Sequence, residues 1–255
     1  MKFNFKLIAL ILFFQVSAGF NGIHAQEITD GSLNTWFLQF SRLNLNEKWS
    51  FTNELHYRTG EFLSNPGLIL IRPSVDYHLN KEVEFSLGYT LVYAEPFEPY
   101  SLQAPAFENN LWWQAWIKNK IGNTSLQHRF REEHRWLDNL VQTENGDFEK
   151  DGANFVNRFR YRFTVIFDLI KLNDDALFCV VFDEVWLSQN DQLLFTDLNR
   201  NWLYGGLGYR FSKNSNLQLG FNYQSDKVAS GEFINSPVIQ LSYFHNFHLK
   251  SSNSE

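Results

Sequence analysis

The chain has 255 residues, a net charge of −6 and a single cysteine, Cys179. The negative charge argues against a protein that binds nucleic-acid phosphates, and one cysteine excludes an internal disulfide or a zinc site built from several cysteines. Aromatic residues make up 17% of the chain, which is typical of β-strands and membrane interfaces and excludes a disordered chain.

The first 25 residues have the pattern of a secretory signal peptide. Lys2 and Lys6 precede a short apolar run, and small residues lead to Ala25. The run is too short to span a bilayer as a helix. We therefore expect cleavage after Ala25 and export of residues 26–255 as one β-barrel domain, with an uncleaved anchor as the alternative.

Apolar and polar residues alternate with a period of two through the rest of the chain. In one such segment Trp49, Phe51 and Leu55 share one face, while Glu54 and Arg58 share the other. No apolar stretch after residue 25 reaches the length of a transmembrane helix, and lipid satisfies no backbone hydrogen bonds, so a membrane protein of this kind must be a closed barrel. The alternation predicts strands near residues 34–43, 48–58, 67–79, 82–94, 109–120, 123–136, 155–169, 176–188, 198–211, 217–225 and 237–249.

Short and long connections alternate between these strands. The short connections are near residues 44–48, 78–81, 120–123 and 212–216, and the long ones cover 59–67, 95–108, 137–154, 189–197 and 226–236. We predict an all-β fold: a single antiparallel transmembrane β-barrel of about 10–12 strands, with short periplasmic turns and longer extracellular loops. Bacterial barrels have even strand numbers, which favours twelve. The additional strand would have to lie near Glu27–Ser32, where the alternation is poor.

The polar faces of the predicted strands carry many arginines and several carboxylates. An arginine that faced lipid near the bilayer midplane would cost about 2–4 kcal/mol, so we predict that these residues line the lumen. One interpretation is a salt-bridged, hydrated core that fills a narrow barrel. The other is an arginine-lined pathway for a small anion. The predicted lumen residues are Glu54, His56, Arg58, Arg72, Asp76, Glu84, Arg129, Arg131, Glu133, Arg135, Arg158, Arg160, Arg162, Glu184, Arg200 and Arg210.

The succession of strands resembles a family of predicted Gram-negative outer-membrane barrels, domain of unknown function 2490 (DUF2490). The resemblance spans most of residues 26–255 and implies fold and location, but no activity. The order and spacing of the matching segments are more specific than any single motif among them. It is carried by Trp36, Leu43–Trp49, Glu54–Arg58, Leu87-Gly-Tyr89, Arg129–Glu133, Arg158–Arg162, Asp183-Glu-Val185, Asn199-Arg200 and Gly205–Tyr209.

The sequence shows no catalytic, metal or cofactor motif. His128, His134, His245 and His248 have no serine or aspartate partner in a recognisable arrangement, and we interpret them as polar residues near strand ends. We interpret His56 and His78, with Asp76 nearby, as hydrogen-bonding lumen residues. The proline-rich segment 94–107 is either a rigid surface loop or a partner-binding loop.

Our leading functional hypothesis is a non-enzymatic outer-membrane barrel, structural or accessory to a surface complex. Its partners would be outer-membrane lipid and another outer-membrane or surface protein. The first alternative is a narrow channel for small anionic solutes, and the second is an outer-membrane lipid-modifying hydrolase. A secreted soluble barrel or sandwich would alternate in the same way, but its apolar face would point inward. The direction of the two faces therefore discriminates between the membrane and soluble readings.

Overall fold

The computed structural model describes residues 29–96, 102–172, 175–228 and 230–249. The predicted signal peptide lies outside the described residues, as does part of the proline-rich segment. No helix in the described ranges is long and apolar enough to span a membrane. The strands are β1 (Thr29–Asp30), β2 (Asn34–Asn44), β3 (Trp49–Gly60), β4 (Asn65–His78), β5 (Val83–Ala94), β6 (Ala106–Ile121), β7 (Thr124–Gln142), β8 (Phe148–Leu172), β9 (Asp175–Gln189), β10 (Phe195–Ser212), β11 (Ser215–Lys227) and β12 (Phe233–His248).

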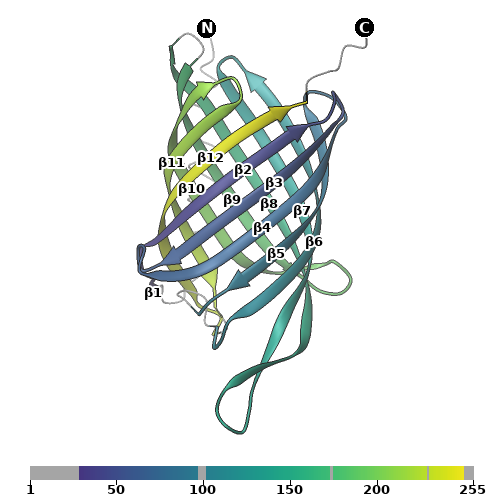
Figure 1. Cartoon of the computed structure of the whole chain (residues 1–255), viewed down its shortest axis with the longest axis vertical. Coiled ribbons are helices and arrows are strands. Elements are labelled where there is room, and N and C mark those ends of the chain that lie inside the picture. The colour runs from purple at the N-terminus through teal and green to yellow at the C-terminus, as the bar shows by residue number, and fades with distance from the viewer. Residues whose placement is uncertain (1–28, 97–101, 173–174, 229, 250–255) are drawn as a thin grey trace.

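The strands form one sheet that closes into a barrel (Figure 1). From β2 to β12, each strand pairs antiparallel with the next in sequence. The barrel is closed by a parallel pairing of β12 with β2, in which Asn34 lies opposite Val238 and Asn44 opposite His248. The all-β barrel predicted from the sequence is confirmed. Among the described strands it departs from an antiparallel arrangement at β12, which pairs parallel with both β2 and β1.

The barrel itself has eleven strands, within the predicted range of ten to twelve. The two-residue β1 is a twelfth strand of the sheet, in the stretch where the sequence placed an additional one. It does not add a strand to the circumference of the barrel, because β1 and β2 pair with the same edge of β12, one after the other. Thr29 of β1 lies opposite Ile234, four residues before Val238, the first β12 residue that pairs with β2. With an odd number of strands, the first and last run in the same direction, which explains the parallel closure.

The alternation of the sequence sets the two faces of the barrel wall. Leu87 and Leu219, on the apolar face, are 59% and 57% exposed, whereas Glu133 and Glu184, on the polar face, are fully buried. The polar face therefore points into the lumen and the apolar face points outward. A soluble barrel would have the opposite arrangement.

The two ends of the barrel differ. Short turns lie at the end where β12 finishes, and a long hairpin of β7 and β8 projects from the opposite end (Figure 1). The sequence placed a loop at residues 137–154, and the strands in fact continue through most of it. The prediction was wrong there because residues on both faces of this hairpin are solvated, which removes the apolar alternation that marks a strand.

Candidate functional site in the lumen

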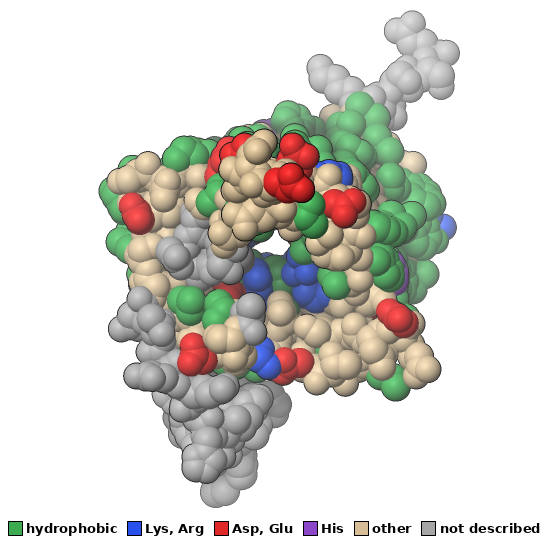
Figure 2. Space-filling model, turned by 90° about the horizontal axis from the view of Figure 1, so that it is seen from below, with side chains coloured by type: hydrophobic (Ala, Val, Ile, Leu, Met, Phe, Trp, Pro, Cys, Tyr) green, Lys and Arg blue, Asp and Glu red, His purple; other side chains and the backbone are tan. Residues whose placement is uncertain are grey.

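The lumen contains a cavity of about 510 Å³ lined by residues from strands along the whole barrel, including Trp36, Glu54, Arg162 and Phe244. Viewed from the end that carries the β7–β8 hairpin, the barrel has a central opening with Lys and Arg side chains on its wall (Figure 2). The cavity lies within the range of about 300–1,000 Å³ that is common for small-molecule sites.

Glu184 on β9 is one of three carboxylates that bind the central arginines of the lumen. It is fully buried, and it accepts hydrogen bonds from Arg129, Arg160 and Arg162. The distance from Arg160 Nε to the nearer carboxylate oxygen is 2.8 Å. One carboxylate thus holds three guanidiniums that come from two neighbouring strands, β7 and β8.

Glu133 on β7 is the second carboxylate. Arg158 Nε donates to it at 2.6 Å and Arg160 Nη1 donates at 2.8 Å. Arg131 Nη1 lies 3.8 Å from the same carboxylate. Arg160 therefore bridges Glu133 and Glu184 and links the two groups of ion pairs.

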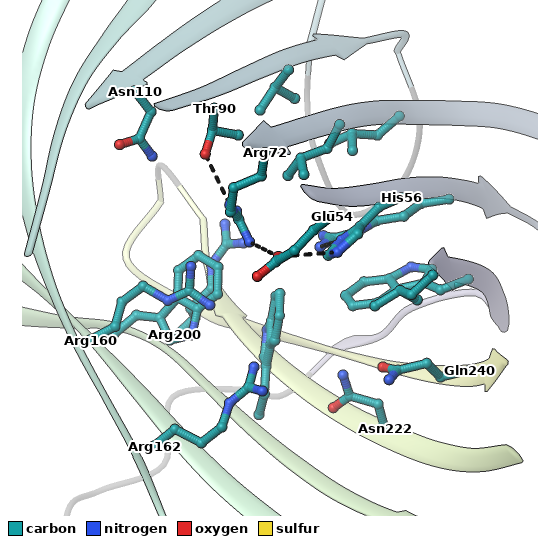
Figure 3. A pocket seen from close by; sticks show the side chains of 18 of the residues that line it. Glu54, His56, Arg72, Thr90, Asn110, Arg160, Arg162, Arg200, Asn222 and Gln240 are labelled. Carbon is teal, nitrogen blue, oxygen red and sulfur yellow. Dashed lines mark hydrogen bonds and ion pairs between the residues drawn. The ribbon is translucent and has the colours of Figure 1, made fainter. Parts of the chain in front are cut away.

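Glu54 on β3 is the third carboxylate and approaches from the other side of the cavity. Arg72 Nη1 donates to it at 2.8 Å, and Arg131 Nη2 lies 3.8 Å away. Arg72 Nε also donates to Thr90 Oγ1 at 2.9 Å, and His56 Nε2 lies 3.4 Å from the Glu54 carboxylate (Figure 3). These contacts fix Arg72 between two neighbouring strands.

The register of β7, β8 and β9 explains why this arrangement forms. Arg129 lies opposite Arg162, and Arg131 lies opposite Arg160. Like charges directly opposite each other destabilise a sheet, and the carboxylates between them offset that repulsion. Arg162 in turn lies opposite Glu184 on β9.

Together these residues form a central ion-pair cluster with a surplus of positive charge. In the described part of the chain, six guanidiniums share three carboxylates, which leaves three positive charges in excess. Their surroundings are of low dielectric constant, so the electrostatic potential of the surplus is larger than it would be in water. The cluster comprises Arg72, Arg129, Arg131, Arg158, Arg160, Arg162, Glu54, Glu133 and Glu184.

Aromatic rings hold the other faces of several guanidiniums. The Cζ atom of Arg160 lies 3.6 Å from the ring centroid of Trp186, and that of Arg58 lies 3.7 Å from Trp36. Arg131 lies 4.2 Å from the ring of Trp112. Such contacts contribute about 2 kcal/mol when desolvated, so the arginines are held by rings as well as by carboxylates.

The inward-facing aromatic residues were missed by the sequence analysis. Trp36, Phe178, Trp186, Trp202 and Tyr204 are buried and pack as one apolar cluster against the lumen side of the wall. The signal was present in the run 176–182, which is apolar on both faces. A strand that is apolar on both faces contacts apolar groups on both sides, which points to an apolar patch within the lumen.

The predicted lumen residues all lie on the inward face, but only part of them form the central cluster. Nearer the barrel ends, Arg135 pairs with Glu108, and Arg200 with Asp226. At the short-turn end Glu84 binds Arg42, while Asp76 accepts from Thr52 and Ser50, and Arg210 pairs with Asp168. Sequence reasoning missed the charged partners Arg42, Glu108, Lys118, Asp168 and Asp226.

Three of the four histidines considered as catalytic bases have neutral partners. His245 Nδ1 lies 2.6 Å from Ser215 Oγ, His128 Nδ1 lies 2.8 Å from Tyr161 Oη, and His134 lies 2.7 Å from Asn157. Ser215 is buried, and across the described residues no carboxylate contacts these imidazoles. The Ser215–His245 pair thus lacks the third group that orients a catalytic base. The described residues also contain no group of three or more potential metal ligands.

Comparison with known families gives one match that covers most of the chain. A family model described as a protein of unknown function (DUF2490) matches residues 33–235. Comparisons with curated proteins and with solved structures give no match.

Proposed function

This chain belongs to the DUF2490 family of proteins of unknown function, and from its lumen we propose a non-enzymatic outer-membrane β-barrel that admits small anions. The family description assigns no activity, so the proposal rests on the chain's own geometry. The apolar outer face supports the membrane location. Outer-membrane lipid would cover it, and the polar face would line a passage between the two barrel ends.

The outer face supports the proposal because it offers large apolar side chains to the surroundings along most strands. Ile69, Ile71, Phe85 and Leu207 are each between 44% and 54% exposed. In water such a surface would be an aggregation site, whereas in lipid it is the expected lipid-facing band of a barrel.

The single observation that carries the anion selectivity is the surplus of three positive charges in the central ion-pair cluster. A cation that enters this section would meet guanidiniums that its carboxylates only partly neutralise. An anion would be attracted, because the low-dielectric walls focus the potential along the lumen.

A structural or accessory barrel is the second candidate, and two observations favour it. The arginines are engaged by carboxylates and rings, which is how a plugged lumen would be held. The β7–β8 hairpin also projects beyond its neighbours: β6 pairs with β7 only as far as Leu137, and β8 pairs with β9 only from Asn157. The free edges of this hairpin are suited to a protein partner that adds a strand.

Recordings in planar bilayers distinguish the two candidates. We expect stable conductance with a reversal potential that indicates anion preference in a salt gradient. Arg162→Gln should shift that potential towards cations, because it removes one of the surplus charges from a side chain that is 20% exposed to the lumen.

Lys150→Gln is the matched control, since Lys150 lies on the projecting hairpin and its neutralisation should leave the selectivity unchanged. If the purified protein shows no stable conductance, that result would favour the structural candidate. Unchanged selectivity in Arg162→Gln would contradict an anion passage governed by the central cluster.

A further inference from the structure

The wall of the cavity across from the arginines carries neutral polar groups that have no hydrogen-bond partner among the described residues. Asn222 on β11 is fully buried, and neither its Nδ2 nor its Oδ1 atom makes a hydrogen bond. In Figure 3, Arg160 and Arg162 lie on one side of the cavity, and Asn222 and Gln240 lie on the other. A buried amide with both atoms unused requires an explanation, because such groups are costly to desolvate.

The hydroxyl of Tyr204 belongs to the same wall. Tyr204 on β10 lies directly opposite Asn222 in the β10–β11 register, is 1% exposed, and has no hydrogen-bond partner for its Oη atom. Trp36 and Trp186 line the same cavity, and their buried Nε1 atoms likewise have no hydrogen-bond partner among the described residues. Four side chains from four strands thus line one cavity and carry buried polar atoms without a hydrogen-bond partner among the described residues.

The chemistry of these atoms indicates what they would bind. The Asn222 amide and the Tyr204 hydroxyl each offer both a donor and an acceptor, and a hydroxyl group on a ligand satisfies both at once. The indole N–H groups are donors only, so they match an oxygen atom. The guanidiniums on the facing wall match a carboxylate.

We propose that the cavity is a binding chamber for an anion that carries several hydroxyl groups, a polyhydroxylated carboxylic acid of the uronic-acid type. This inference rests on the proposed function and adds a substrate class to it. The acid group lies against the Arg160 and Arg162 side, and the hydroxyl groups lie against Asn222 and Tyr204. The neutral wall, and not the cationic one, distinguishes this ligand from other anions.

Isothermal titration calorimetry of the refolded barrel in detergent tests the proposal with three compounds. D-glucuronate carries both features, D-glucose has the hydroxyl groups without the charge, and cyclohexanecarboxylate has the charge and a ring without the hydroxyl groups. We expect glucuronate to bind at least about tenfold more tightly than either of the others, because sites built to hydrogen-bond a hydroxyl reject an analogue that lacks it.

Two variants separate the walls of the chamber. Asn222→Leu should lower the affinity for glucuronate about tenfold and leave cyclohexanecarboxylate binding unchanged, because two hydrogen bonds to the ligand are lost. Arg162→Gln should weaken the binding of both anions. Asn145→Leu, at the exposed tip of the β7–β8 hairpin, is the control, and heat-modifiable gel mobility verifies that each variant is folded.

Equal affinity for glucuronate and cyclohexanecarboxylate would overturn the inference, because the neutral wall would then be hydrated and not occupied by ligand hydroxyl groups. That result would leave the anion passage intact if conductance still prefers anions. A loss of glucuronate binding in Asn222→Leu, with unchanged anion preference, would instead support a chamber within the passage.

Discussion

Glu184 shows at the residue scale how the lumen combines stability with charge. Its buried carboxylate is the shared acceptor of Arg129, Arg160 and Arg162. Without that carboxylate three guanidiniums would lie together in a low-dielectric space, where like charges repel strongly. The same residue therefore holds the arginines in place and limits how positive the lumen becomes.

Glu184→Gln should destabilise the barrel by about 3–5 kcal/mol, the usual cost of leaving a buried charge without its partner. Urea unfolding of the barrel in lipid vesicles measures this change. Combining it with Arg162→Gln should recover part of the loss, because one unpaired charge is removed.

Glu47→Gln is the control for that series, since Glu47 is exposed in the turn between β2 and β3 and its replacement should have little effect. A Glu184→Gln barrel as stable as the unmodified protein would show that water, and not the carboxylate, compensates the arginines.

At the scale of the strands, glycines on one strand leave space for aromatic rings from the neighbouring strand. Gly88 on β5 lies opposite Trp112 on β6, and a Cβ atom at Gly88 would overlap the Trp112 ring. Phe178 lies over Gly208 in the same way between β9 and β10. These inward glycines allow a narrow lumen to hold large rings flat against its wall.

Gly88→Val should destabilise the barrel, because the added side chain displaces Trp112 and with it the ring that contacts Arg131. The expected cost is about 1–3 kcal/mol or more, measured by the same urea unfolding. Gly205→Val is the matched control, since no atom lies within 4 Å of a Cβ atom at that position. Equal effects of the two substitutions would contradict the proposed packing.

The molecule as a whole is a barrel with an apolar outer face and a lumen lined by charged residues. This arrangement predicts where the protein is located. We expect the protein to fractionate with outer membranes and to migrate faster on a gel when unboiled than when boiled, because a closed barrel resists unfolding by detergent. Recovery as a soluble periplasmic protein without a mobility shift would contradict the membrane proposal.

The sequence by itself determined the β-strand architecture, because apolar and polar residues alternate with a period of two through most of residues 34–249. It predicted the all-β barrel, most strand positions and the inward direction of Arg129, Arg131, Arg158 and Arg160. It also predicted the number of strands to within one, since turn residues separate the alternating segments. Polar stretches such as residues 137–154 lack alternating apolar and polar residues, so the continuation of β7 and β8 into this segment could not be predicted from the sequence.

Only the tertiary structure decided how the charges are partnered. Glu184 binds arginines from β7 and β8, and Glu54 reaches Arg131 across the lumen, contacts that depend on register and on closure. Strand parity was likewise decided by the pairing of β12 with β2. The alternation is local to each strand, whereas the lumen is formed by strands far apart in sequence, and its balance of charge exists only once the barrel has closed.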